Sequence, residues 1–343
     1  MIKHNFSEPM NINFPKLEER IMAINHPDFT KVEEMREMLY GLLVDGKPTL
    51  IMATGGSKVV AYYLQLILER LRFSGIIAEV IEPRDYFYKE NREMFSNLVV
   101  ISASGGTNGV KEALSDFQGN KYLICEEENV IDGTVISWSN ECYEKEKSFI
   151  SLASSLAPIT LLLDATASIG LELSQKEIQD NNEKIHELFL RSQEKVECLP
   201  VSFKDTNLIQ IMSGYETRVS GSVLESNLTE SGIMIPVLHD KGSFCHGRSN
   251  LLFQYPESKF IYLTHGKKEL DSILIDLIQE EYSNLSIFDT EDLDDDIFWK
   301  EYYLLLQMYF LSKKIAEDKN MDLTQPEYHP KIIHKIYRFR GEM

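Results

Sequence analysis

The chain has 343 residues, enough for two domains with buried cores, and 43% are hydrophobic, as in an ordinary soluble globular protein. With 35 Lys and Arg against 54 Asp and Glu, the formal net charge is −19, which argues against sequence-independent nucleic-acid binding. Four scattered cysteines without a CxxC pair predict no disulfide framework or zinc site, and favour a reducing cytoplasm. The N-terminal segment lacks an apolar signal core, and no run approaches the ~18 apolar residues of a membrane span, so we expect no membrane partner.

Strand-like and helical patterns alternate through the first half of the chain. After a polar arm over residues 1–28, the strand-like runs cover residues 49–53, 76–82, 97–103, 121–126 and 148–152. Residues 151–169 are a long apolar stretch, which we expect to form a buried helix that begins with serines. Alternating strands and helices predict a parallel sheet with helices on both faces, here over residues 29–173.

The same pattern restarts in the second half. A charged helix over 174–200 is expected to link the halves, and further strand-like runs cover residues 207–212, 233–238, 259–265 and 284–288. The similar layout indicates a divergent duplication. We therefore predict two α/β domains, each with a parallel sheet of about five strands between helices, as in a flavodoxin-like sandwich. The second domain spans 201–318, and a C-terminal tail follows over 319–343.

Two strands in the first half end in similar turns of small residues. One turn is Thr54-Gly55-Gly56-Ser57, and the other is Ser102-Ala103-Ser104-Gly105-Gly106-Thr107. N–H groups at a helix N-terminus and Ser or Thr hydroxyls can bind a phosphate, and glycine lets the backbone come close. Glycine and serine are also ordinary turn formers, but two such turns at the ends of parallel strands favour a phosphorylated ligand. Neither turn is a P-loop or a dinucleotide fingerprint, so a sugar phosphate fits better than a nucleotide.

A carboxylate and an imidazole in the second half form another candidate site. Glu230 ends a predicted helix, and His246 lies 16 residues later in a turn. Brought together, they would act as general base and general acid. A solvated glutamate and a loop histidine with no shared function would have the same spacing. His239 is a rival to His246 but lies in a polar turn.

Together these motifs resemble the double sugar-isomerase (SIS) domain family over about residues 30–320. The family includes the isomerase half of glucosamine-6-phosphate synthase and the fructosamine 6-phosphate deglycases. Its Ser-x-Ser-Gly-x-Thr turn is matched by residues 102–107, and the Gly-Gly-Ser of the deglycases by residues 55–57. The family's Ala-Ser-Thr helix start appears as residues 153–155, and its glutamate–histidine spacing as Glu230 and His246. The tail, with its KIYRFR segment, is similar to the deglycase terminus.

The resemblance implies roles for particular residues. Glu230 and His246 would be catalytic, and no metal or cofactor would be needed for proton transfer. The phosphate-binding residues would be Gly55, Gly56, Ser57, Ser102, Ser104 and Thr107. Further substrate contacts would come from Ser154, Ser155, Tyr337 and Arg338. The family also implies a homodimer or larger assembly, in which the histidine of one subunit completes the site of another.

The preferred reaction is cleavage of a fructosamine 6-phosphate into glucose 6-phosphate and an amine. An aldose–ketose phosphosugar isomerase or an amino-sugar-phosphate deaminase is the first alternative, and a non-catalytic sugar-phosphate binding protein is the second. Asn227 stands where the synthase has lysine, which disfavours the synthase-type reaction. Arg248 replaces the family's proline after His-Gly, and Thr54 stands where cysteine is common. No glutamine-hydrolysing domain precedes the SIS pair, so a whole synthase is not expected.

Overall fold

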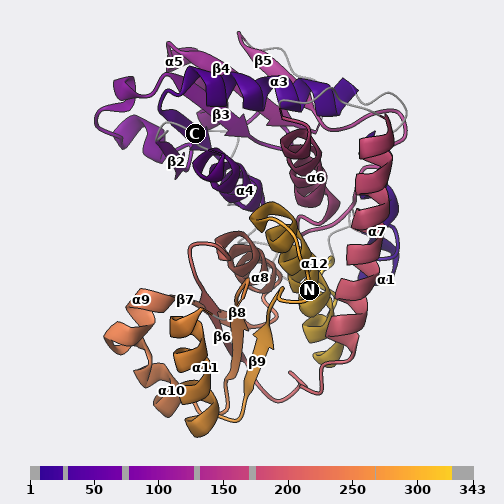
Figure 1. Cartoon of the computed structure of the whole chain (residues 1–343), viewed down its shortest axis with the longest axis vertical. Helices are drawn as coiled ribbons and strands as arrows, with labels where there is room; N and C mark the ends of the chain where they lie inside the picture. Colours follow the sequence, from indigo (N-terminus) through magenta and orange to yellow (C-terminus); the bar gives the residue numbers. More distant parts are fainter. Residues whose placement is uncertain are drawn as a thin grey trace.

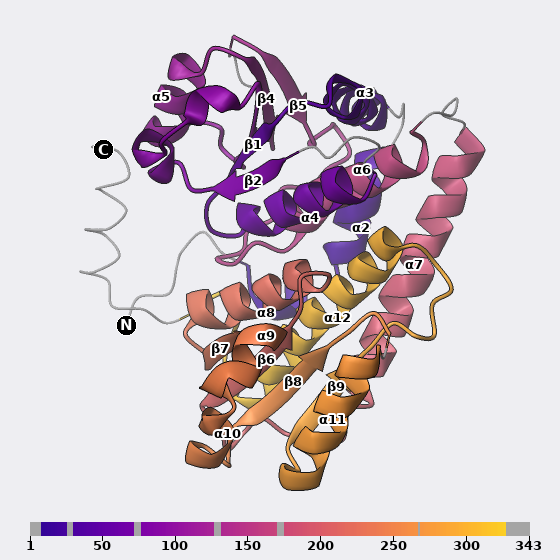
Figure 2. The same ribbon diagram turned by 60° about the vertical axis from the view of Figure 1, so that its left-hand side comes forward.

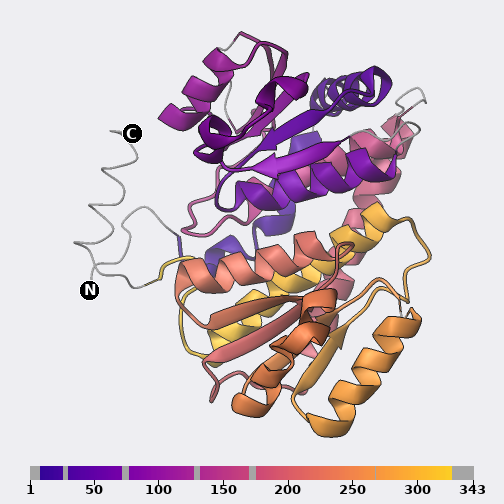
Figure 3. The same ribbon diagram turned by 90° about the vertical axis from the view of Figure 1, so that its left-hand side faces the viewer.

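The computed structural model describes residues 8–25, 30–71, 77–126, 132–169, 175–266 and 268–326. They form two parallel sheets, each with helices on both faces, and two helical layers lie between the sheets (Figure 1). The predicted α/β fold class is thus confirmed. Figures 2 and 3 show the same layers from the side, with α4 of the first half lying along α8 of the second.

The first sheet has the strand order β2-β1-β3-β4-β5, with every neighbouring pair parallel. Its strands are β1 (Thr49–Met52), β2 (Ala78–Ile81), β3 (Asn97–Ile101), β4 (Asn120–Cys125) and β5 (Thr134–Ser137). Its helices are α3 (Thr30–Asp45), α4 (Ser57–Arg70), α5 (Asn108–Asp116) and α6 (Ala153–Ala167). Shorter helices are α1 (Met10–Asn13), α2 (Leu17–Met22), η1 (Ala23–Asn25), η2 (Asp85–Tyr88) and η3 (Arg92–Met94).

Side chains of the first sheet alternate between two cores, as the two-residue period of a strand requires. Ile51 and Val99 pack in the core that includes α3, α4 and α6. Leu50 and Leu98 pack on the opposite face, in a core with α5. The helices that follow the neighbouring strands β1 and β3 therefore cover opposite faces of the sheet.

The second sheet has the order β7-β6-β8-β9, again all parallel. Its strands are β6 (Leu208–Ser213), β7 (Ile235–Asp240), β8 (Lys259–Leu263) and β9 (Leu285–Phe288). The helices of this half are α7 (Gln175–Glu197), α8 (Arg218–Ser231), α9 (Lys241–Ser243), the π-helical η4 (Phe244–Arg248), α10 (Asn250–Gln254), α11 (Glu269–Glu281) and α12 (Ile297–Asp318).

Two details of the prediction were wrong. The described residues form four strands in the second sheet, not about five. The expected strand over 148–152 is not a strand, and the fifth strand of the first sheet is β5. Residues 148–152 have an apolar character because Ile150 and Leu152 are buried in the core where the chain enters α6.

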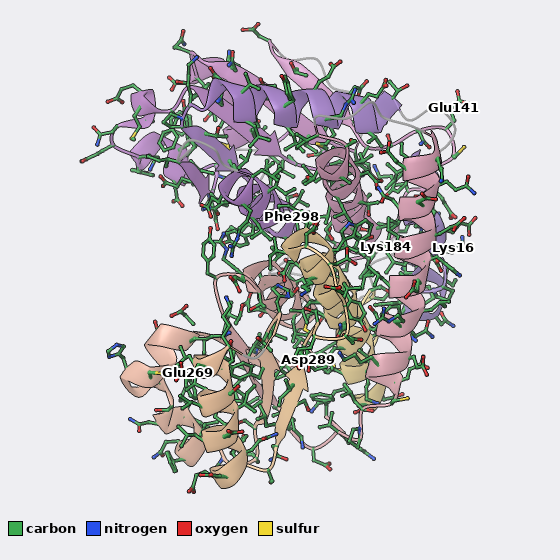
Figure 4. The ribbon with its side chains drawn as sticks, viewed as in Figure 1. Lys16, Glu141, Lys184, Glu269, Asp289 and Phe298 are labelled. Carbon is green, nitrogen blue, oxygen red and sulfur yellow. The ribbon has the colours of Figure 1, made fainter. Side chains whose placement is uncertain are left out.

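Helices α4, α6, α8 and α12 join the two halves. Tyr63 of α4 donates a hydrogen bond to the carbonyl of Phe298 (3.0 Å), the residue labelled between the halves in Figure 4. Arg218 of α8 donates to Gln65 of α4 (2.8 Å), and Thr160 of α6 pairs with Tyr302 of α12 (2.9 Å). The contact between Arg218 and Gln65 fixes α8 along α4. Within the described residues, no helix has the length and apolar character needed to cross a membrane.

Candidate functional site

The first small-residue turn follows β1 and opens α4. Gly55 has a φ of +57°, a left-handed conformation that glycine adopts most readily. Gly56 has an ordinary helical φ, but a Cβ atom there would lie 2.5 Å from Cβ of Ser151, so a side chain would not fit. Ser57 is the first residue of α4. The N–H groups of Lys58 and Val59 donate to the carbonyls of Gly55 (3.0 Å) and Gly56 (3.2 Å), and no N-cap side chain among the described residues bonds to this helix. The turn therefore lies at a helix N-terminus, whose partial positive charge attracts an anion.

The second turn follows β3 and opens α5. The hydroxyl of Ser102 accepts a hydrogen bond from N–H of Gly105 (3.2 Å), and that of Ser104 accepts one from N–H of Gly106 (3.4 Å). The hydroxyl of Ser102, which accepts in this way, still has a proton to donate. Thr107 is the N-cap residue of α5, and its side chain makes no capping hydrogen bond. Like the first turn, this one lies at a helix N-terminus and carries a serine hydroxyl.

The two turns lie at the carboxyl edge of neighbouring strands, because β1 pairs with β3. The helices that follow them cover opposite faces of the sheet. A crevice at such a topological switch point is where open α/β sheets bind ligands. The structure thus brings residues 55–57 and 102–107 to one edge.

Glu230 lies beside the first turn. Its Oε1 atom is 3.9 Å from the position that a Cβ atom on Gly55 would take. Ser226, one helical turn earlier on α8, donates a hydrogen bond to the same oxygen (2.8 Å). Arg218, at the start of α8, contacts Gln65 towards the end of α4, so the two helices are antiparallel and the last turn of α8 meets the first turn of α4.

His246 lies at the other end of the second sheet. Helix α8 has 14 residues, about 20 Å, and carries the chain from the carboxyl edge of the sheet back to its amino edge near Glu230. Strand β7 then returns to the carboxyl edge, where His246 is exposed in η4. Within one chain, Glu230 and His246 do not meet.

His239 is part of the core. It is fully buried, and its Nε2 lies 3.1 Å from Oε1 of Gln210. Burial, and to a lesser extent the charge of Arg248, lowers the pKa of His239 to about 4. A neutral, buried imidazole of this kind contributes to the packing of the core.

The predicted serines at the start of α6 differ in their surroundings. Ser154 is partly exposed and hydrogen-bonded to the carboxylate of Glu146. Ser155 is buried, and its hydroxyl bonds to Tyr309 and to the carbonyl of Leu152 (3.0 Å). The other two predicted substrate contacts, Tyr337 and Arg338, lie outside the described residues.

The equivalent edge of the second sheet holds the protein's own ion pairs. Lys241, after β7, contacts the buried Asp271 in the first turn of α11, and Tyr262 donates to the same carboxylate (2.6 Å). His265, after β8, lies 2.8 Å from the buried Glu301. These side chains at the second switch point thus pair with one another, which favours the first sheet as the ligand-binding half.

A surface cavity of about 480 Å³ adjoins the first turn on the β2 side. Its lining includes Lys58, Tyr62, Glu79, Glu82, Asp85 and Lys89. Lys89 pairs with Glu79 (2.6 Å) and Lys58 with Glu82. Partial burial lowers the pKa of Lys58, but the hydrogen bond and charge of Glu82 raise it, so that its pKa lies above the ordinary value.

Sequence reasoning missed Glu146 and Ser151 as neighbours of the site. Glu146 accepts hydrogen bonds from N–H of Leu152 (3.1 Å) and Ala153 (2.6 Å), at the start of α6. It lies six and seven residues ahead of these donors, outside the usual offsets of a helix cap. No spacing rule could have found it.

The fold is shared with several solved proteins. No protein-family model matches the sequence, and no curated protein sequence matches it. The C-terminal domain of glucosamine-fructose-6-phosphate aminotransferase from Francisella tularensis is similar in structure, with a TM-score of 0.64 and 16% identity over 92% of this chain and 97% of that one. Glucosamine-6-phosphate deaminase from Thermotoga maritima has a TM-score of 0.63 and 13% identity, over 90% and 98% of the two chains. A protein assigned as a phosphosugar isomerase from Clostridium difficile 630 has a TM-score of 0.63 and 16% identity, over 88% and 97%.

These neighbours match nearly the whole of both chains, including the paired sheets and the helical layers between them. At this level of identity the comparison concerns the fold. It agrees with the resemblance noted from the two turns and the glutamate–histidine spacing. The chain therefore has the double sugar-isomerase (SIS) fold of these proteins.

Proposed function

We propose that this protein is an enzyme that processes phosphorylated sugars. The observation that carries the proposal is the position of Glu230, whose carboxylate from the second half borders the Gly55 turn of the first. A phosphate held by the two turns would place the rest of a small sugar within reach of that carboxylate. The names of the structural neighbours, an aminotransferase domain, a deaminase and a phosphosugar isomerase, support this substrate class.

The phosphate would be held at the edge of the first sheet. The proposed contacts are backbone N–H groups of α4 and α5 and the side chains of Ser57, Ser102, Ser104 and Thr107. Because these donors come from two helix N-termini, they would complement an anion without a lysine of the P-loop type. The phosphate would therefore be an anchor and not a transferred group.

Glu230 would act as the general base on the open-chain sugar. It removes a proton from C1 of the ketose, and the electron pair forms an enediol, or an enaminol when C1 carries nitrogen. In the preferred deglycase reaction, protonation at C2 gives an imine at C1. Water then adds to the imine and releases the amine and glucose 6-phosphate. In an isomerase, the same proton shuttle interconverts ketose and aldose.

His246 would act from a second subunit. In one chain it lies at the opposite end of the second sheet from Glu230, so it cannot complete the same site. A homodimer that places the exposed His246 beside the partner's Gly55 turn would supply the general acid for ring opening. This arrangement makes dimer formation a requirement of catalysis.

One observation disfavours the synthase-type reaction, and another leaves room for a larger amine near the first turn. Asn227 occupies the synthase lysine position, where it is buried and donates to Ser312 (3.3 Å), so it is engaged within the fold. The cavity beside Lys58 offers room for an amine larger than ammonia. An amino-sugar deaminase, the alternative, would release ammonia only.

A mass-spectrometric screen tests the proposal. Hexose 6-phosphates, amino-sugar 6-phosphates and fructosamine 6-phosphates made from amino acids are incubated with the protein and with Glu230→Gln. We expect turnover of a fructosamine 6-phosphate to glucose 6-phosphate and free amine by the wild type alone. Binding of these compounds without turnover by the wild type would instead support the non-catalytic sugar-phosphate binding protein.

A further inference from the structure

The start of α6 holds a carboxylate that belongs to the protein. Both oxygens of Glu146 accept hydrogen bonds there, Oε1 from N–H of Leu152 and Oε2 from N–H of Ala153. A negative charge at this position complements the partial positive charge of a helix N-terminus. The N-terminus of α6, unlike those of α4 and α5, is therefore already occupied by a carboxylate of the same chain, that of Glu146.

Two serine hydroxyls connect Glu146 to the site. Ser154 Oγ is hydrogen-bonded to Oε1 of Glu146, and Ser151 Oγ lies 2.6 Å from Ser154 Oγ. An ionised carboxylate can only accept, so Ser154 must donate its proton to Glu146. Ser151 must then donate its own proton to Ser154. Ser151 can therefore interact with a third partner only as a hydrogen-bond acceptor, through its lone pairs.

Ser151 borders the same glycine pair as Glu230. Its Oγ is 3.1 Å from the position of a Cβ on Gly56, while Oε1 of Glu230 is 3.9 Å from the corresponding position on Gly55. Ser151 is also partly exposed. A ligand whose reacting carbons lie beside Glu230 would therefore have Ser151 close to the same end.

The surroundings of Glu146 act on its charge in two directions. Burial raises the pKa of Glu146, and the hydrogen bonds from Ser154, Leu152 and Ala153 lower it, with the net value above the ordinary one. The backbone N–H groups of Leu152 and Ala153 can only donate, so these two hydrogen bonds favour the ionised form and oppose the effect of burial.

We propose that Glu146 is a positioning residue that, through Ser154, holds Ser151 as a hydrogen-bond acceptor towards the ligand. The site would accordingly prefer a sugar phosphate that carries an ammonium or other N–H donor next to its reacting carbons. A hydroxyl can donate or accept and so tolerates either orientation of Ser151, whereas an ammonium can only donate. The inference rests on the proposed function, because it takes C1 and C2 of a hexose 6-phosphate to lie beside Glu230.

The test compares two ligands that differ at C2. Dissociation constants are measured by calorimetry at neutral pH for glucosamine 6-phosphate and glucose 6-phosphate, with the wild type and Glu146→Ala. In the variant, no carboxylate accepts from Ser154, so Ser154 can donate to Ser151 and Ser151 can point its proton at the ligand. We expect the preference for glucosamine 6-phosphate over glucose 6-phosphate to fall about tenfold, as for loss of one charge-assisted hydrogen bond.

Two further variants separate orientation from stability. Ser154→Ala breaks the connection but leaves Glu146 bonded to the helix N–H groups, so it should lose the preference while keeping the melting temperature. Thr166→Ala, at the other end of α6, should keep both. If the wild type binds both sugars and Glu146→Ala leaves their affinity ratio unchanged, the proposed role of Glu146 is wrong while the proposed function stands. If the wild type binds neither sugar, the proposed function itself fails.

Discussion

Replacement of Gly56 by alanine tests how closely the first turn packs against α6. The added Cβ would lie 2.5 Å from Cβ of Ser151, whereas carbon atoms in contact prefer about 3.5–4.0 Å. One of the two segments must therefore move by about 1 Å or more. Because the clash is with a Cβ atom and not with the end of a flexible side chain, the segments cannot relax by rotating a rotamer. Overpacking of this kind destabilises a protein by about 1–3 kcal/mol.

The assay is thermal unfolding together with phosphate binding. A loss of about 1–3 kcal/mol would lower the melting temperature by about 2–12 °C in a domain of this size, and the displaced turn should bind phosphate more weakly. Gly41→Ala is the matched control, because Gly41 lies within α3 and its nearest neighbour would be the Tyr122 hydroxyl at 3.8 Å, an ordinary contact. Alanine there should raise stability by about 0.5–1 kcal/mol. A Gly56→Ala protein that melts and binds like the wild type would refute the packing described here.

Three other predictions concern the site and the core. Ser102→Ala should weaken phosphate binding about tenfold or more in a calorimetric titration, since it removes a donor to an anion, and unchanged affinity would exclude this serine from the site. Mixing Glu230→Gln with His246→Ala subunits should restore activity in verified heterodimers, and inactive heterodimers would count against shared sites. The pKa of His239 is about 4 in the folded protein and about 6.5 when unfolded, so the unfolded state binds the extra proton between these values and stability falls as pH is lowered through them. The loss should reach about 3 kcal/mol and be missing in His239→Leu, as measured by urea unfolding across this pH range; equal pH profiles for both proteins would contradict it.

Local sequence patterns were sufficient for eight of the nine described strands and for the two turns, whereas β5 was missed. The apolar runs around Ile51 and Val99 stop at glycine and serine, so the end of each strand and the start of the next helix could be placed without a structure. The run over 148–152 misled the prediction, because burial of Ile150 and Leu152 beside α6 produces the same apolar signal as a strand. A short apolar segment alone does not distinguish a buried strand from a loop that packs into the core.

Contacts between distant segments could not be predicted from spacing. The approach of Glu230 to Gly55 depends on α8 lying antiparallel to α4, which is set by packing across the two halves and by contacts such as Arg218 to Gln65. The separation of Glu230 from His246 within one chain likewise follows from the direction of α8 and β7. The spacing of 16 residues between Glu230 and His246 predicts neither the approach to Gly55 nor the separation of the two side chains.

The most direct test of the central claim is proton exchange on the sugar. The protein is incubated in D₂O with hexose 6-phosphates and fructosamine 6-phosphates, and deuterium at C1 and C2 is followed by NMR. If Glu230 is the base, the wild type should incorporate solvent deuterium at these carbons of at least one compound. Glu230→Gln should exchange about 10²–10⁴ times more slowly while still binding the sugar. Equal exchange rates for the two proteins would contradict the account.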